Sequence, residues 1–304
     1  MKNGVTLRGA VAVNPPVVDA QGLGVAITVT NCGTSTIVKD VIFRNGLGTG
    51  FGGGAQITAS SLTMERCRFE NNTAMHGGGV GGDGAFSLNA CVFDGNHATD
   101  TGGAVAMTDL PSPTITSCRM SSNIASAGGA IAVRNGSQPA ITTTILDENT
   151  ADQGSGIWWD FFAGGTMQLC TVVENTALAV QGGALYSSPL SSPLITRTIV
   201  AFNTAGGATS IAPGASPTFG CNDLFGNIGG NSITGGVDLG TNIFLNPLFC
   251  NAAGDDYSLQ GSSPCLFGGA CGQIGAAGAG ACVALAADAS FEPLTWGALK
   301  ARYH

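Results

Sequence analysis

Charged residues are scarce in this chain of 304 residues: they make up 10% of it, and only 11 are Lys or Arg. Binding of a nucleic-acid backbone requires clustered basic side chains, so a formal net charge of −8 with scattered cations argues against a nucleic-acid partner. Long apolar runs are also missing, since no stretch reaches the roughly 18 consecutive apolar residues of a membrane-spanning helix. We therefore expect no transmembrane helix.

Low charge combined with 48 Gly residues is a composition that disordered linkers share. Val, Ile, Leu and Phe nevertheless recur regularly, which gives each segment an apolar face to bury. We therefore expect an ordered chain from residue 1 to about residue 285. The acidic balance is most simply a matter of solubility, and a divalent-cation site is the less favoured explanation.

A phrase of the form apolar-x-x-Asn, followed by a Gly pair and an apolar residue, occurs seven times. Examples are FDGN with GGAV and MSSN with GGAI. Its asparagines are Asn72, Asn96, Asn123, Asn149, Asn175, Asn203 and Asn227. Successive copies are 24 to 28 residues apart. A period of this length, without helix caps between the copies, is typical of stacked coils that cannot bury an apolar face alone.

Alternation within each copy predicts short strands. Apolar residues stand three positions before each Asn, and Cys, Thr or Asn stands five positions before it, so the shared parity places both inside. The inward column of the strand after the Gly pair contains Val80, Val105, Ile131, Ile157 and Leu185. The sequence therefore predicts an all-β fold: a single-stranded right-handed parallel β-helix with three sides and about 26 residues per coil.

Three regions follow from this pattern. The coils are expected over residues 1–228, and an irregular closing cap with disulfide-prone cysteines over residues 229–285. A tail is expected over residues 286–304, where Leu294, Leu299 and Tyr303 stand at roughly helical spacing and Thr295 is a candidate N-cap.

The seven asparagines fall at the same corner of successive coils, about 4.8 Å apart along the stack. At this spacing their side chains can hydrogen-bond to one another and to the turn backbone as a ladder. Seven equivalent positions indicate a structural ladder rather than a ligand site.

The ten cysteines divide into two groups. Cys67, Cys91, Cys118 and Cys170 fall in the interior column, where we expect mostly free thiols because parallel side-chain vectors make disulfide geometry poor. The C-terminal five are Cys221, Cys250, Cys265, Cys271 and Cys282. Disulfides that pin the cap are their expected use, with the pairing left open, and this indicates an oxidising compartment.

Several phrases, among them FDGNHATDTGGAV and VVENTALAVQGGAL, resemble the polymorphic outer-membrane-protein repeat with its FxxN and GGA[IV] elements. More broadly, residues 1 to about 285 look like pectin-lyase-like right-handed β-helix proteins of secreted bacterial origin, and NPLFCNAAGDDYSLQGSSPC is similar to their closing segment. The resemblance implies the fold but no single activity, since such proteins include lyases, hydrolases and adhesins. The Gly-Asp-Asp at residues 254–256 lies in the closing segment and is discounted as a catalytic match.

A candidate binding groove follows the strand after the Gly pair. By parity one outward column contains Gly81, Ala106, Ala132, Trp158 and Tyr186. The next contains Asp83, Thr108, Arg134, Asp160 and Ser188, with Asp109 just beyond. Small residues beside aromatic rings predict a groove with a stacking wall that suits sugar rings. Trp158, Tyr186 and Trp159 are the candidate substrate-binding residues.

Catalysis is the competing hypothesis for this surface, with Asp83, Asp109, Arg134 and Asp160 as candidate residues. At about 4.8 Å per coil, Asp83 and Asp109 would lie roughly 5 Å apart, and Asp109 and Asp160 roughly 10 Å apart, which fits glycosidase geometry only marginally. In a lyase the three carboxylates would hold Ca²⁺ while Arg134 abstracts a proton. The simpler alternative is a solvated face with an ion pair between Arg134 and Asp160.

Two histidines, His76 and His97, follow the Asn corner at similar distances. We expect them to form a loop pair near Asp100 rather than a metal site, because no third ligand is evident.

The sequence thus favours a secreted or cell-surface β-helix that recognises an extended polysaccharide or a surface partner along the solenoid face. A polysaccharide lyase or glycoside hydrolase, and a passive adhesin or stalk scaffold, are the alternatives. No cofactor is firmly expected, and Ca²⁺ belongs to the lyase alternative. The first residues lack the apolar core of a signal peptide, so we expect that export information has been trimmed from that end.

Overall fold

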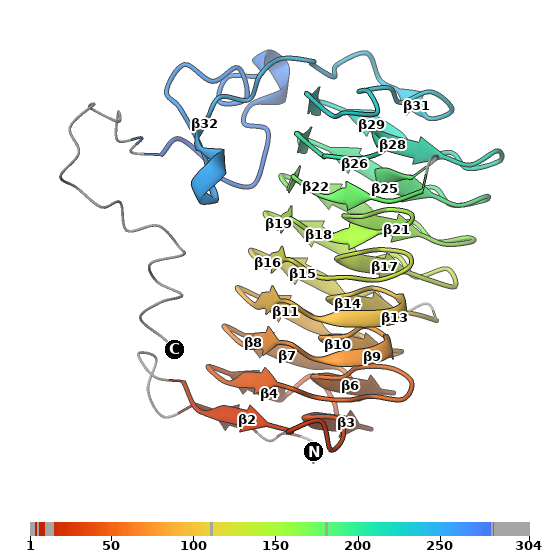
Figure 1. Ribbon diagram of the computed structural model, residues 1–304, viewed down its shortest axis with the longest axis vertical. Helices are drawn as coiled ribbons and strands as arrows, with labels where there is room; N and C mark the ends of the chain where they lie inside the picture. Colours follow the sequence, from red (N-terminus) through yellow and green to blue (C-terminus); the bar gives the residue numbers. More distant parts are fainter. Residues whose placement is uncertain are drawn as a thin grey trace.

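The computed structural model describes residues 4, 6–9, 15–109, 112–179, 182–280 and 282. Within them the chain winds into a stack of coils, one strand per side per coil, with the early coils at one end and the late coils at the other (Figure 1). The predicted all-β right-handed parallel β-helix of roughly 26 residues per coil is confirmed. The predicted tail, 286–304, lies outside the described residues.

Three parallel sheets form the sides of the solenoid. Sheet A contains, in spatial order, β1 (Thr6–Arg8), β4 (Thr36–Lys39), β7 (Leu62–Glu65), β11 (Ser87–Asn89), β15 (Thr114–Thr116), β18 (Ala140–Thr142), β22 (Thr166–Gln168), β26 (Leu194–Thr196), β29 (Thr218–Gly220) and β31 (Val237–Asp238). Sheet B contains β2 (Val17–Asp19), β5 (Ile42–Arg44), β8 (Arg68–Glu70), β12 (Val92–Asp94), β16 (Arg119–Ser121), β19 (Ile145–Asp147), β23 (Thr171–Val173), β27 (Ile199–Ala201) and β30 (Asp223–Phe225). Sheet C contains β3 (Ile27–Thr30), β6 (Ala55–Thr58), β10 (Val80–Gly82), β14 (Val105–Met107), β17 (Ile131–Val133), β21 (Ile157–Trp159), β25 (Gly183–Ser187) and β28 (Gly207–Ile211).

Shorter strands lie between sheets B and C and in the cap. Between the sheets, β9 (Thr73–His76) pairs with β13 (His97–Thr101), and β20 (Thr150–Ala151) pairs with β24 (Thr176–Ala177). In the cap, β32 (Phe249–Asn251) pairs antiparallel with β33 (Asp256–Leu259), and two short 3-10 helices are η1 (Ala252–Gly254) and η2 (Gly269–Cys271). No helix among the described residues is long and apolar enough to cross a membrane.

Inward side chains stack in register along the axis of the solenoid. Phe43, Phe69 and Phe93 are fully buried, and their rings stack with centroids 5.4 and 4.8 Å apart. The expected inward column of sheet C is also confirmed, because Val80, Val105, Ile131, Ile157 and Leu185 are at most 2% exposed. Each such side chain contributes about 1.5–3 kcal/mol through burial.

The predicted asparagine ladder is confirmed at one corner of the coils. The Asn96 carboxamide oxygen accepts hydrogen bonds from the Asn72 backbone N–H and side-chain NH₂, at 3.1 and 2.9 Å. The Asn72 NH₂ also donates to the Phe43 carbonyl of the preceding coil. In the same way, the side-chain oxygen of each later asparagine accepts a hydrogen bond from the side-chain NH₂ of the asparagine one coil earlier, at Asn123, Asn149, Asn175, Asn203 and Asn227. The buried turn backbone is thereby satisfied.

Both cysteine expectations hold among the described residues. Cys67, Cys91, Cys118 and Cys170 are buried free thiols. Of two disulfides, Cys221–Cys271 joins the last coils to the cap, and Cys250–Cys282 closes a loop within the cap. The remaining C-terminal cysteine, Cys265, is a buried free thiol.

The cap packs against the outer side of sheet B. Outward residues Val173, Ile199 and Ala201 form a second hydrophobic core with cap residues, among them Phe249, Tyr257, Leu259, Cys265 and Ile274. Figure 1 shows β32 and its neighbours beside the late coils rather than along the axis. The C-terminal part of sheet B is therefore buried on both faces.

Candidate functional site

The outward column of sheet C has the predicted register. Gly81 pairs with Ala106, Ala106 with Ala132, Ala132 with Trp158, and Trp158 with Tyr186 in successive parallel strands. Side chains at these positions therefore lie one above another along the stack. Sequence parity alone was enough to place this column on the outside of the sheet.

The expected open groove is wrong for the early part of this column. Ala106 and Ala132 are fully buried, and Gly81 is buried as well. The reason is the turn before each strand of sheet C, which folds over the column: a Cβ on Gly81 would lie 2.6 Å from the His76 carbonyl oxygen. Small residues are required there by this close approach, so they do not mark a binding floor.

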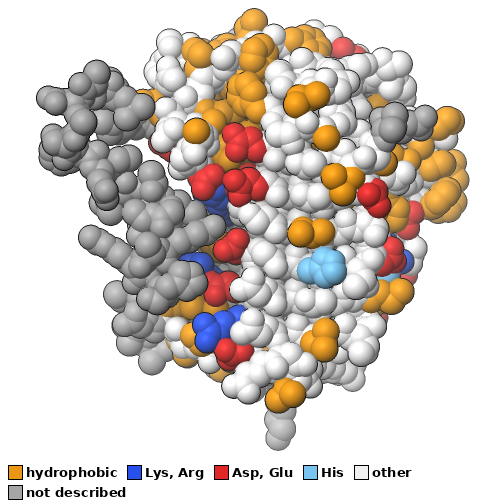
Figure 2. Space-filling model, in the orientation of Figure 1, with side chains coloured by type: hydrophobic (Ala, Val, Ile, Leu, Met, Phe, Trp, Pro, Cys, Tyr) orange, Lys and Arg blue, Asp and Glu red, His pale blue; other side chains and the backbone are white. Residues whose placement is uncertain are grey.

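Large apolar side chains replace the small ones in the next two coils. Trp158 and Tyr186 are partly exposed, and the loops that follow their strands expose Phe161 (51%), Phe162 (65%) and Leu190 (53%). We call these five residues the aromatic ridge. Figure 2 shows hydrophobic side chains gathered at the right-hand edge, where the loops of the late coils project. Such a concentration of exposed apolar surface is typical of binding sites.

Trp158 and Trp159 lie on opposite sides of β21. The Trp158 indole N–H is buried without a hydrogen-bond partner. Trp159 is 1% exposed and belongs to the solenoid core, so its prediction as a substrate-binding residue is wrong. The cause is the two-residue period of a strand, which turns neighbouring side chains to opposite faces.

The four candidate catalytic residues lie in successive coils, and among the described contacts none of them forms a hydrogen bond or an ion pair with another of the four. Asp83 accepts a hydrogen bond from the Ala59 N–H at 2.8 Å, and Asp109 accepts one from the Asn135 side chain at 3.3 Å. Backbone hydrogen bonds place Arg134 and Asp160 one coil apart. No ion pair among the described residues joins these two, so the expected pair is absent. Catalysis at these residues, with or without Ca²⁺, stays a prediction.

The two histidines lie on paired strands of neighbouring coils, β9 and β13, so their expected neighbourhood is confirmed and their expected place in loops is wrong. His76 Nδ1 lies 2.9 Å from Thr101 Oγ1 and 3.4 Å from an Asp100 carboxylate oxygen, so His76 is close to Asp100 as expected. His97 pairs with Thr73 and is exposed. Burial lowers the pKa of His76, and the Arg134 charge lowers it further, so its imidazole is neutral at pH 7.

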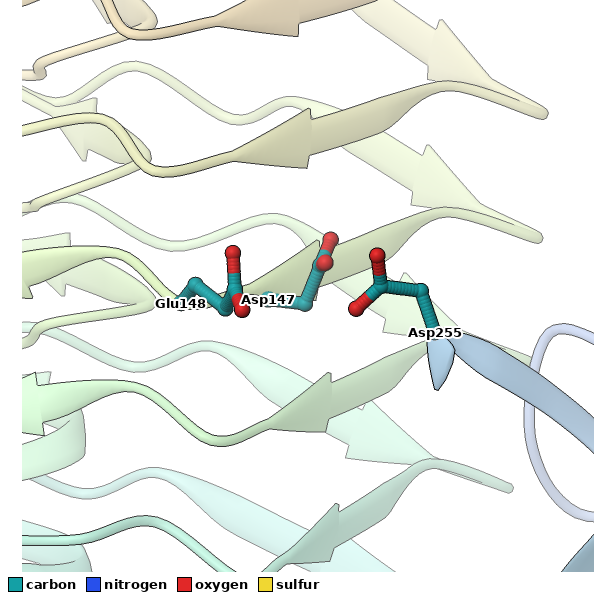
Figure 3. Close-up of side chains that lie close together, drawn as sticks. All are labelled: Asp147, Glu148 and Asp255. Atoms are coloured by element: carbon teal, nitrogen blue, oxygen red, sulfur yellow. The ribbon is translucent and has the colours of Figure 1, made fainter. Parts of the chain in front are cut away.

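A cluster of carboxylates that the sequence did not reveal lies where the cap meets sheet B. Figure 3 shows Asp147 and Glu148 of the solenoid facing Asp255 of the cap, with carboxylate oxygens within 4.8 Å of one another. Glu174 of the next coil accepts a hydrogen bond from the Tyr257 hydroxyl at 3.3 Å. We call these four carboxylates the carboxylate junction.

Arg119 provides positive charge at the carboxylate junction. Its guanidinium donates two hydrogen bonds to the fully buried Asp147, at 2.6 and 3.2 Å, and lies 3.7 Å from Asp255. It also lies 5.7 Å from the centre of the Tyr257 ring. Because Arg119 already neutralises Asp147, the junction is built as an ion-pair network between the cap and the coils.

Burial dominates the protonation equilibria at this interface. It raises the pKa of Asp147 despite the bonds from Arg119. Burial also raises the pKa of Glu174, and repulsion from Glu148 and Asp255 adds to it. Further along sheet B, burial raises the pKa of Asp223 to about 6, where its carboxylate accepts a hydrogen bond from the Cys265 thiol.

A family model described as right handed beta helix region matches residues 25–189. The matched segment covers 165 of the 304 residues, from 189 − 25 + 1, which is more than half of the chain. The chain belongs to the right-handed beta helix family. Neither the curated proteins nor the solved structures that were searched contain a match to it.

Membership of the right-handed beta helix family accounts for the coils and leaves the activity open. The match includes β21 and the whole of β25, and ends at residue 189, before the cap. A β-helix fold supports a structural or binding role in broad terms. The finer resemblance to pectin-lyase-like proteins and to polymorphic outer-membrane-protein repeats stays a prediction.

Proposed function

We propose that this β-helix protein binds an extended polysaccharide at the aromatic ridge, in an extracellular or cell-surface setting. The observation that carries the proposal is the exposure of Phe161 and Phe162 beside Trp158 and Tyr186. Two disulfides in the cap support an oxidising compartment.

The shape of the ridge suits a chain of sugar rings. Trp158 and Tyr186 occupy the same position in neighbouring coils, which places their backbone positions about 4.8 Å apart along the solenoid. Phe161 and Phe162 extend the apolar surface from the strand into the following loop. Aromatic faces stack on the apolar faces of sugars, and the ridge offers several such faces in a row.

Asp160 and Arg134 lie one coil apart beside the ridge and their charges offset each other, which favours a neutral polysaccharide over an acidic one. Asp160 follows β21 directly, and the chain carries a net charge of −8, so a polyanionic glycan would be repelled overall. Recognition by stacking does not depend on ion pairs and should persist at high salt.

The test is binding of the purified chain to a panel of soluble neutral and acidic polysaccharides, measured by affinity electrophoresis and calorimetry. The double variant Phe161→Ala/Phe162→Ala removes exposed rings that the core does not use, so the fold should be retained. We expect its affinity for the bound polysaccharide to fall by about tenfold or more, as the loss of stacked rings predicts.

The matched control is Ile124→Ala, which removes an apolar side chain that is 48% exposed outside the ridge. It should bind as the unaltered chain does. Equal affinities for the double variant and the control would refute the ridge as the binding site. Absence of binding across the whole panel would favour a passive scaffold, and new oligosaccharide products would indicate an enzyme.

A further inference from the structure

The carboxylate junction concentrates like charges at the contact between two parts of the chain. Four carboxylates and one guanidinium meet there, so the junction carries a charge of −3 when all of them are ionised, from one minus four. Three of the carboxylates belong to the solenoid, and Asp255 belongs to the cap. Like charges therefore face one another across the surface along which the cap would separate.

The charged and titratable groups at the junction come from both the solenoid and the cap. From the solenoid, β16 contributes Arg119, β19 and the corner after it contribute Asp147 and Glu148, and the corner after β23 contributes Glu174. From the cap, the residue that ends η1 contributes Asp255, and β33 contributes Tyr257. Burial raises the pKa of the Tyr257 hydroxyl, so it remains a hydrogen-bond donor to Glu174.

We propose that this junction is a proton-operated clasp, in which proton uptake by the carboxylates tightens the cap on sheet B and proton release loosens it. The surface that loosening exposes is apolar, since Val173, Ile199 and Ala201 lie beneath the cap. The clasp acts on the cap and is independent of what the aromatic ridge binds.

The sign follows from proton linkage. Because burial raises the pKa of Asp147 and Glu174 above their ordinary values of 3.8 and 4.5, the closed state binds protons more tightly than the open state. Their contribution to closure is complete below those ordinary values and is lost as the pH rises through the raised ones. Asp223, with its pKa raised to about 6, acts in the same direction beneath the cap. Closure should therefore weaken between about pH 4 and neutral pH.

The test is hydrogen–deuterium exchange with mass spectrometry on the full chain with its disulfides intact, at pH 5 and pH 8. Rates are corrected for the intrinsic effect of pH on exchange. Protection of peptides from residues 246–280 should be several-fold greater at pH 5. Peptides from residues 60–100, which lie in coils away from the cap, are the internal control and should show equal protection at both values. Equal protection of the cap peptides at pH 5 and pH 8 would overturn the proposal.

Variants separate the clasp from a general effect of pH. Glu174→Gln keeps an acceptor for the Tyr257 hydroxyl while removing one charge, so cap protection should rise at pH 8 and its pH dependence should shrink. Asp83→Asn, on the sheet C side, is the matched control and should behave as the unaltered chain does. If Glu174→Gln fails to fold, Asp255→Asn gives the same readout from the cap side, and Asn tolerates the left-handed backbone at that position (φ 60°). If the pH dependence of cap protection is unchanged in both variants, the proposal is overturned.

Discussion

The interior of the coils and the interface beneath the cap both bury apolar side chains, but they organise them differently. Inside the coils each residue meets its own equivalent one coil away, as Phe69 meets Phe93 and Asn72 meets Asn96. Beneath the cap, unlike residues meet: Ile199 packs with cap residues, and Arg119 bonds Asp147 beside Asp255. Repetition therefore stabilises the coils through many equivalent contacts, whereas the cap depends on a few unique ones.

The largest loss of stability should come from interrupting the ring stack inside the coils. Phe93→Ala removes a fully buried ring and leaves a cavity, so the free energy of unfolding should fall by about 3–5 kcal/mol. Urea unfolding followed by circular dichroism measures it. Phe267→Ala, at a position that is 80% exposed, is the control and should change little. A loss below about 1 kcal/mol for Phe93→Ala would contradict a tightly packed interior.

Removing a cap disulfide should destabilise the cap and leave the stability of the coils unchanged. Cys250→Ser/Cys282→Ser opens a crosslink between residues 32 positions apart, and the chain-entropy model predicts a loss of about 2–4 kcal/mol in cap stability. Exchange protection should fall for residues 246–280 and stay the same for the coils. If the coils lost protection to the same extent, the cap and the solenoid would unfold as one unit, and the comparison would fail.

A smaller loss should follow the removal of one rung of the asparagine ladder. Asn149→Ala leaves the Asn123 backbone N–H and side-chain NH₂ without their acceptor, so we expect a loss of about 1–3 kcal/mol. Asn89→Ala, on the exposed side of β11, is the control and should be close to neutral. Equal stabilities of the two variants in urea unfolding would show that the ladder contributes nothing beyond packing.

The coils could be predicted from the sequence because repetition makes local patterns add up. The ladder Asn recurs seven times and the inward column of sheet C five times at similar spacings, so parity alone assigns Val80 and Trp158 to opposite faces. Parity does not reveal what folds over a face, and the burial of Ala106 beneath a turn was missed for that reason. The exposed rings of Phe161 and Phe162 stand outside the repeating positions, where the pattern makes no prediction.

The carboxylate junction could not be predicted, because its members come from distant parts of the chain. Asp255 belongs to a Gly-Asp-Asp phrase, but nothing local in the sequence connects it with Arg119 or Asp147. Such contacts depend on how an irregular segment docks, which is set by the apolar surface of sheet B rather than by any period. The available signal was the apolar character of Ile145, Val173 and Ile199 at outward positions of three successive strands, because outward positions on a solvated face are usually polar.

The asparagine ladder has a direction, because each carboxamide accepts from the coil before it and donates to a carbonyl of that same earlier coil. The Asn of a newly inserted coil would therefore accept a hydrogen bond from the Asn of the coil before it and donate one to the Asn of the coil after it. Duplication or deletion of a whole coil leaves every neighbour satisfied, whereas a change of one or two residues at the corner breaks two rungs at once. Shorter insertions and deletions must therefore fall away from this corner, as the spacing of 24 to 28 residues between asparagines shows, whereas the number of rungs changes only by whole coils.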